Sequence, residues 1–149
     1  MEFEDHLRTT SGALKNWFIA QLYDALAVAG LWFVGLKLLH VPLALLWALL
    51  GGALQFIPGI GTAVAVLGPA LSAGLSRGWE PFLYVLMLYA GIVVIDGFVL
   101  QPLLMKRTAR VPVWASLLTP IVLGIIIPFW GVLLSPPLLA VVFAYRARK

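Results

Sequence analysis

Long apolar runs separated by short polar connections dominate this chain. The first run covers residues 17–36 and is interrupted by one charge, Asp24, and a second covers 82–100 and is interrupted only by Asp96. Each run has about 20 residues, which as an α-helix crosses a hydrocarbon layer about 30 Å thick. We therefore predict two membrane-spanning helices, each with one acidic residue inside it.

A pair of shorter apolar arms follows each predicted span. Arms over 41–56 and 62–75 meet at the segment Ile57-Pro58-Gly59-Ile60-Gly61, and arms over 111–127 and 132–145 meet at Pro128-Phe129-Trp130-Gly131. Proline removes a helical hydrogen bond and glycine tolerates turn conformations, so each joint should break the helix. The sequence predicts two helical hairpins and leaves open whether each is re-entrant or consists of two short, tilted spans.

The two hairpins align without a gap when the second is shifted by 70 residues. Val41-Pro42 then matches Val111-Pro112, Ile57-Pro58 matches Ile127-Pro128, and Gly61 matches Gly131. A predicted span precedes both hairpins at nearly the same distance, as expected of an internal repeat. We predict one all-α membrane domain over 1–149, organised as follows: a polar lead (1–15, amphipathic or disordered), unit one (16–76, with span 17–36 and hairpin 41–75), unit two (79–145, with span 82–100 and hairpin 111–145) and a basic tail (146–149).

Composition agrees with a membrane protein and excludes an ordinary soluble domain. The chain is 62% hydrophobic and 11% charged, with a mean hydropathy of +1.04, whereas a soluble domain is about half apolar and about a quarter charged. The net charge of +4 comes from basic residues in the gaps between apolar runs, which indicates membrane orientation and no nucleic-acid partner. The absence of cysteine excludes disulfides and thiol chemistry.

Charge placement predicts the orientation. With a cytoplasmic N-terminus, the inner side carries eight basic residues and the outer side two; the inner set is Arg8, Lys15, Lys106, Arg107, Arg110, Arg146, Arg148 and Lys149, and the outer set is Lys37 and Arg77. This distribution satisfies the positive-inside rule and places both termini in the cytoplasm. It also opens the first hairpin outward and the second inward, so the two units are related by inverted topology.

Inverted repeats with broken segments at matching positions are typical of secondary transporters, whose sites form where broken helices meet. The turns leave backbone groups that a polar substrate, an ion or water can satisfy, although tips that only pack on neighbouring helices are the alternative. A carboxyl in hydrocarbon must be protonated, paired or hydrated, and one that exchanges a proton could couple transport to the proton gradient. Asp96 lies near the end of its span, so position alone leaves an interfacial role open for it. The predicted pathway residues are Asp24, Gln55, Pro58, Gly59, Gly61, Asp96, Gln101, Pro102, Pro128 and Gly131.

No enzymatic constellation is expected. Tyr23-Asp24, Asp96 and Pro69-Ala70-Leu71 share elements with intramembrane aspartyl proteases, but those enzymes place the second Asp after Gly-x-Gly and Pro-Ala-Leu last. His6 lies in the polar lead and His40 at a loop, so no metal or cofactor is predicted.

An ordered set of motifs resembles the autoinducer-2 exporter-like family of bacterial transporters, also called PerM-type permeases. The motifs are Phe56-Ile57-Pro58-Gly59-Ile60-Gly61, then Asp96 ahead of Gln101-Pro102, then Gly131 with Ser135-Pro136-Pro137-Leu138. The resemblance runs from about Leu14 to the C-terminus and corresponds to the C-terminal half of such proteins. It implies a multi-pass carrier of the bacterial inner membrane, homo-oligomeric, that exports small molecules or exchanges sodium or protons, with motif positions at Pro58, Gly61, Asp96 and Pro102.

Two departures accompany the resemblance. Members are usually longer, with N-terminal spans and a soluble helical region that this chain does not show, and many carry Gly where this chain has Lys106-Arg107. The chain is therefore expected to be a short member that assembles from several copies, an inactive fragment, or an interaction subunit for another membrane chain. Transport and interaction remain the two alternatives at this point.

Overall fold

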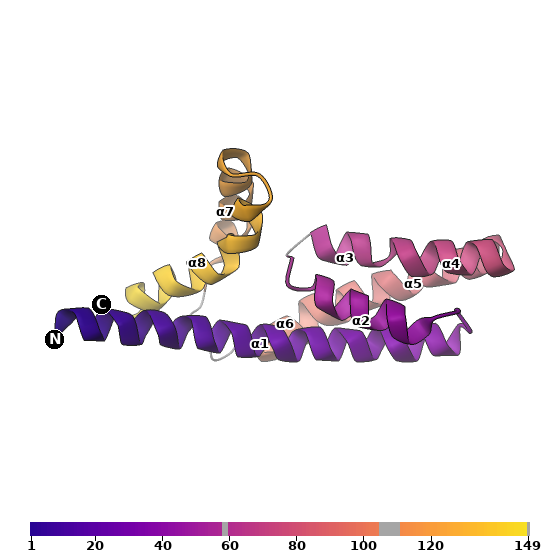
Figure 1. Ribbon diagram of the computed structural model, residues 1–149, viewed down its shortest axis with the longest axis horizontal. Coiled ribbons are helices and arrows are strands. Elements are labelled where there is room, and N and C mark those ends of the chain that lie inside the picture. Colours follow the sequence, from indigo (N-terminus) through magenta and orange to yellow (C-terminus); the bar gives the residue numbers. More distant parts are fainter. Residues whose placement is uncertain (58–59, 105–110, 149) are drawn as a thin grey trace. The chain divides into compact units, whose positions relative to one another are not determined.

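The computed structural model describes residues 1–57, 60–104 and 111–148, and every regular element in these ranges is a helix. Contacts divide the chain into two compact units, Tyr23–Leu103 and Met1–Leu22 with Leu104–Lys149. The elements follow in chain order, and Figure 1 labels those named α. They are α1 (Glu2–Leu38), α2 (Ala44–Leu54), α3 (Ile60–Ala65), α4 (Leu67–Arg77), α5 (Trp79–Ile95), η1 (Asp96–Leu100), α6 (Gln101–Leu104), α7 (Val113–Ile126) and α8 (Trp130–Arg146). The compact units do not coincide with the predicted repeats, whose inverted relation stays a prediction.

Helix α1 is longer than the predicted span because the polar lead is helical from Glu2 onward. Its first turn carries acidic side chains and its last turn Lys37, both favourable toward the helix dipole. The hydroxyls of Thr9 and Ser11 donate to the carbonyls of Asp5 and Arg8. These bonds give the hydroxyl groups of the polar lead partners within the helix, so the lead and the apolar run form one helix.

The predicted first hairpin is present as α2 followed by α3 and α4. Helix α2 contacts both α3 and α4, and α4 packs on α5. Helices α3 and α4 together cover Ile60–Arg77, 18 residues, so this arm is longer than the 62–75 predicted. Pro58 and Gly59 lie outside the described residues.

Small residues allow the helices of the Tyr23–Leu103 unit to pack closely. A Cβ on Gly52 would lie 2.7 Å from the carbonyl oxygen of Ala25, and one on Gly51 would lie 2.8 Å from the Trp32 ring. Close backbone approach through small residues is the usual basis of helix association in membranes. The core of this unit contains Val28, Trp32, Leu36, Val41, Ala44, Ala48, Val66, Ala70, Ala73, Val85 and Ile92.

The second predicted span is one continuous 26-residue apolar helix, Trp79–Leu104, formed by α5, η1 and α6. The segment η1 is a π-helical turn, an irregularity that the sequence pattern did not predict. With Glu2–Leu38 and Ile60–Arg77, this is one of three described helices long and apolar enough to cross a membrane.

The second predicted hairpin forms in the other compact unit. Helices α7 and α8 pack against each other, and the Tyr145 hydroxyl on α8 donates to the His6 carbonyl at 2.7 Å and lies 2.8 Å from the Thr10 hydroxyl. Arg148 also contacts the Thr9 hydroxyl. These bonds attach the end of α8 to the helical lead.

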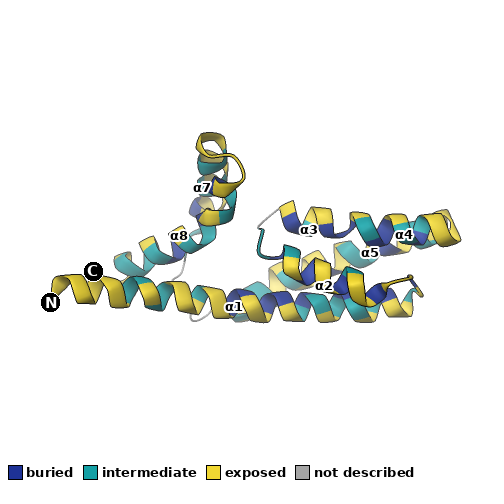
Figure 2. Ribbon diagram, viewed as in Figure 1, coloured by how far each residue is buried: buried dark blue, intermediate teal, exposed yellow. Residues whose placement is uncertain are grey.

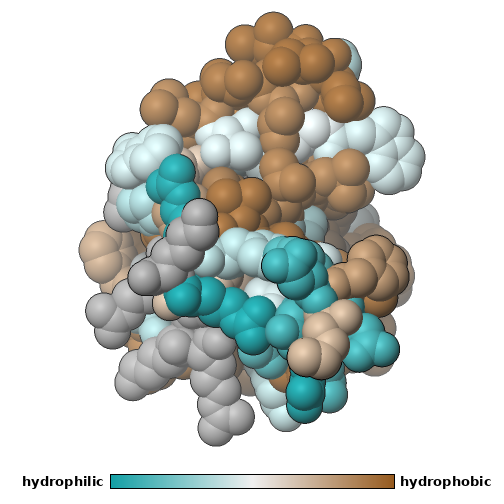
Figure 3. Space-filling view, turned by 90° about the vertical axis from the view of Figure 1, so that its left-hand side faces the viewer, coloured by the Kyte–Doolittle hydropathy of each residue, from teal (hydrophilic) through white to brown (hydrophobic). Residues whose placement is uncertain are grey.

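Exposed apolar side chains cover much of both units. Helix α7 alone exposes Trp114, Leu117, Leu118, Ile121, Val122, Ile125 and Ile126, and Figure 2 shows its exposed surface. Figure 3 shows hydrophobic side chains gathered at one end of the view and hydrophilic ones toward the other. Water-soluble monomers rarely expose so many neighbouring apolar side chains, whereas the hydrocarbon tails of lipids can cover them.

Gly61 and Gly131, which follow the two hairpin joints, make equivalent hydrogen bonds. The Gly61 N–H donates to the Ile57 carbonyl at 2.9 Å, and the Gly131 N–H donates to the Ile127 carbonyl at 2.8 Å. A Cβ on Gly61 would lie 1.7 Å from the Leu54 carbonyl oxygen, and one on Gly131 would lie 2.0 Å from that of Leu123. Each position therefore requires glycine because a side chain would meet a backbone carbonyl, although the two carbonyls are not at matching positions of the sequence repeat.

We expect Gly61→Ala and Gly131→Ala each to lower the free energy of unfolding by about 1–3 kcal/mol, because the new methyl group must displace a backbone carbonyl. Reversible denaturation in mixed detergent micelles measures the change. Gly30→Ala and Gly91→Ala are matched controls, since a Cβ at either position would have no atom within 4 Å. Equal stability of all four variants would contradict the steric role of the two turn glycines.

Candidate functional site

The candidate site is a cluster of two carboxyl groups and two carboxamides inside the Tyr23–Leu103 unit. Asp24 comes from α1, Gln55 from the residue after α2, Asp96 from the start of η1 and Gln101 from the start of α6. All four are residues that the sequence singled out. The structure brings them together although they are up to 77 positions apart in the chain.

Asp24 lies on the buried face of α1. Val28, Trp32 and Leu36 follow it at intervals of four residues, and all four side chains are at most 2% exposed. Residues four apart share one helix face. Asp24 therefore takes a position that the pattern otherwise reserves for apolar core residues.

Both carboxamides donate to both carboxyl groups. Gln55 Nε2 lies 3.1 Å from Asp96 Oδ2 and 3.4 Å from Asp24 Oδ2. Gln101 Nε2 lies 3.1 Å from Asp24 Oδ2 and 3.4 Å from Asp96 Oδ1. A carboxamide nitrogen has two hydrogens, so each Gln can bridge the two acids.

One oxygen of the cluster has no partner. Asp24 Oδ1 is buried and makes no hydrogen bond to any described residue, and the side chain as a whole is 0% exposed. Buried polar atoms are nearly always hydrogen-bonded, so an exception calls for an explanation in terms of an ion, a water or a proton. The unpartnered atom belongs to the more deeply buried of the two acids.

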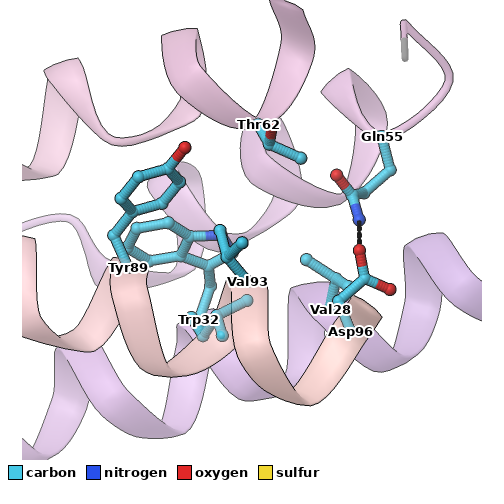
Figure 4. A pocket seen from close by; sticks show the side chains of 8 residues that line it. Val28, Trp32, Gln55, Thr62, Tyr89, Val93 and Asp96 are labelled. Atoms are coloured by element: carbon cyan, nitrogen blue, oxygen red, sulfur yellow. Dashed lines mark hydrogen bonds between the residues drawn. The ribbon is translucent and has the colours of Figure 1, made fainter. Parts of the chain in front are cut away.

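A small cavity adjoins Asp96 and Gln55. The space in which the centre of a water molecule can lie has a volume of about 10 Å³, which is roughly what one bound water molecule requires. Figure 4 shows Gln55 and Asp96 on one side of this cavity, joined by their hydrogen bond, and Trp32 and Tyr89 on the other. The lining residues are Val28, Trp32, Gln55, Thr62, Tyr89, Ile92, Val93 and Asp96.

Six of the eight residues that line the cavity were not predicted, among them the aromatic and hydroxyl-bearing residues Trp32, Thr62 and Tyr89. Tyr89 precedes Asp96 by two helical turns, and Trp32 follows Asp24 by eight residues, so helical spacing places each on the face of an acid that the sequence had identified. Their rings stack with centroids 6.4 Å apart. Thr62 carried no comparable signal, because only the folding of the hairpin brings it beside the cavity.

The remaining predicted positions are not part of this cluster. Gly61 lies in the first hairpin turn, and Pro102 is exposed on α6. Pro128 and Gly131 form the second turn in the other compact unit. Pro58 and Gly59 lie outside the described residues.

The cluster offers proton and small-ion chemistry and lacks the ligands of a typical metal centre. Among the described residues, no group of three or more His, Cys, Asp or Glu side chains could hold a metal ion. Two carboxyls close together in a medium of low dielectric repel when both are ionised. A shared proton or a small monovalent cation relieves that repulsion.

Comparison with known proteins adds a family. No curated protein matches the chain. The family model described as AI-2E family transporter matches residues 1–147 of the 149, which confirms the resemblance found in the motifs. With its three apolar helices of spanning length, the chain is a membrane protein, and it belongs to the AI-2E transporter family.

Proposed function

We propose that this chain is a secondary transporter of the bacterial inner membrane that moves ions or small molecules in exchange for protons or sodium. The observation that carries the proposal is the pair of carboxyls, Asp24 and Asp96, that share the same two amide donors. Membership of a transporter family supports the general function. The buried cluster supports the ion coupling.

The cluster has the properties of an exchangeable ion site. An intramembrane carboxyl is costly when ionised, and most such groups mark substrate or proton pathways. Here the four amide hydrogens of Gln55 and Gln101 are shared between two carboxyl groups. Asp24 Oδ1 has no hydrogen-bond partner among the described residues. Taking up one proton or cation lowers the repulsion and gives this oxygen a partner, whereas releasing it returns the pair to the amides alone.

The adjoining cavity supports a small coupling ion. Its open volume of about 10 Å³ fits one water molecule or a dehydrated ion and excludes an organic solute from this conformation. Thr62 and Tyr89, which carry hydroxyl groups, line the same cavity as Asp96. A proton or sodium ion could reach the acids through it by way of a single water.

The matching hairpin turns support the inverted repeat as part of this proposal. Gly61 and Gly131 make equivalent hydrogen bonds to Ile57 and Ile127, and a side chain at either would meet a backbone carbonyl, which agrees with two copies of one unit. In our proposal the termini are cytoplasmic, the first turn points toward the cytoplasm and the second toward the outside, and the excess of basic residues lies inside. Several copies then associate in the bilayer as a homo-oligomer.

An interaction subunit without transport activity is the competing function. Its support is the large exposed apolar surface, which another membrane chain could cover as well as lipid. The shared-donor cluster favours transport, because packing alone gives no reason to place a buried and a partly buried acid on the same two donors.

The transport proposal predicts flux that depends on the acid pair. Purified protein in liposomes with a pH-sensitive dye should move protons when a sodium gradient is applied. Asp24→Asn and Asp96→Asn should each reduce the initial rate by at least about tenfold, because the cluster can no longer change its charge. Glu80→Gln is a matched control, since this acid lies in the first turn of α5, away from the cluster.

Two results would contradict the transport proposal in different ways. Absence of flux under every cation gradient, with folded protein in the liposomes, would leave the interaction subunit as the better proposal. Flux equal in Asp24→Asn and the wild type would remove the acid pair from the mechanism.

The inverted repeat predicts opposite accessibility of the two turns. The chain has no cysteine, so Ile60→Cys and Phe129→Cys provide unique thiols, each at a residue at least 50% exposed. An impermeant thiol reagent should label Phe129→Cys in intact cells and Ile60→Cys only in inverted vesicles. Labelling of both from the same side would contradict the inversion, and no labelling from either side would place both turns within the bilayer.

A further inference from the structure

The turn η1 interrupts the helix Trp79–Leu104 at the point where two residues of the cluster lie. The Gln101 N–H donates to the carbonyl of Asp96, five residues earlier. This is the hydrogen bond of a π-helix, whereas an α-helix would join Gln101 to Gly97. Single π-turns within α-helices occur often at functional sites.

The π-turn determines which side chains meet. Residues five apart in an α-helix point about 140° away from each other, at 100° per residue. In η1 the extra residue brings Gln101 above Asp96, as residues four apart are in an α-helix. Gln101 Nε2 can therefore lie within 3.4 Å of Asp96 Oδ1 and 3.1 Å of Asp24 Oδ2 at once.

The local sequence weakens the α alternative without excluding it. Pro102 has no N–H to donate to the Phe98 carbonyl, and its ring would crowd that carbonyl in an α-helix. Gly97 has a low helix propensity, and a Cβ there would meet no atom within 4 Å. No residue of η1 is fully buried, and Leu100 at its end is the η1 side chain that packs, partly buried, against the core, so core packing holds most of this turn only weakly.

We propose that η1 is the moving part of the ion site, and that it carries Gln101 onto and away from Asp24 by changing between π and α geometry. This inference rests on the proposed transport function.

A change to α geometry rotates Gln101 by about 100° relative to Asp96. Asp24 Oδ2 then retains only Gln55, at 3.4 Å. The acid pair, having lost a donor, takes up a proton or cation, so the π form is the empty state and the α form the loaded state. Gly97 and Pro102 act as positioning residues that keep the two forms close in free energy.

A direct test measures the movement itself. Spin labels at Val34→Cys and Leu103→Cys occupy sites 57% and 55% exposed within the same compact unit. Their distance distribution, measured by pulsed electron paramagnetic resonance at high and at low pH, should shift when the cluster is protonated. The shift should vanish when Asp24→Asn and Asp96→Asn remove the titrating groups. An unchanged distribution in the wild type overturns the proposal whether or not the protein transports.

A second test removes the extra residue. Deleting Val99, which is 47% exposed, leaves Gln101 four positions after Asp96. Combined with Pro102→Ala, the deletion gives a plain α-helix in which both side chains still share a face. The cluster is thus retained without the residue that allows the register to change. The wild type is the reference for flux, and Pro102→Ala alone separates the effect of the lost proline from that of the lost residue.

The deletion variant should still bind protons, seen as the infrared carboxyl band that Asp24→Asn removes, yet lose sodium-driven flux by at least about tenfold relative to the wild type. Its spin-label distance should not respond to pH. Flux equal to that of the wild type overturns the role of η1 and leaves the transport function standing. Absence of flux in the wild type counts against the transport function, and the distance measurement then still decides whether η1 moves.

Discussion

The placement of two carboxyl groups, the buried Asp24 and the partly buried Asp96, within apolar helices is the constraint on which the Tyr23–Leu103 unit depends. Neither Asp24 nor Asp96 can be accommodated there without donors or a neutralising charge. The fold supplies the donors from Gln55 and Gln101, each of which reaches both acids. Four elements must therefore meet at one place: the middle of α1, the end of α2, the start of η1 and the start of α6.

Close helix packing makes that convergence possible. Gly51 and Gly52 on α2 lie directly against Trp32 and Ala25 of α1, so the end of α2 carries Gln55 within reach of Asp24. Larger residues at these positions would separate the two helices by the width of a side chain. The amide bridge would then be lost even with all four polar residues in place. Packing and chemistry in this unit are thus linked through two glycines.

A proton or small cation at the acid pair connects this architecture to transport. The cluster consists of four polar side chains, its cavity admits one water-sized particle, and one of its donors, Gln101, directly follows a turn in which no residue is fully buried. Because the ionised acid pair is unstable in an apolar environment, its affinity for a proton or cation depends on how many amide donors it has. That affinity can change when the helix changes register and a donor moves. This combination favours a carrier over a passive packing role.

The sequence by itself determined the membrane class, the positions of the helices and both hairpin turns. Apolar runs of spanning length have no stable alternative to helices in lipid, and Pro and Gly break helices through local sterics. It also marked Asp24, Gln55, Asp96 and Gln101 individually, because polar residues within apolar runs are visible one at a time. Only the tertiary structure decided that these four share hydrogen bonds and that Trp32, Thr62 and Tyr89 surround the adjoining cavity, since contacts between distant segments depend on how helices pack. The register of η1 was decided there too, because a π-turn differs from an α-turn by one residue and leaves no periodic trace in so short a segment.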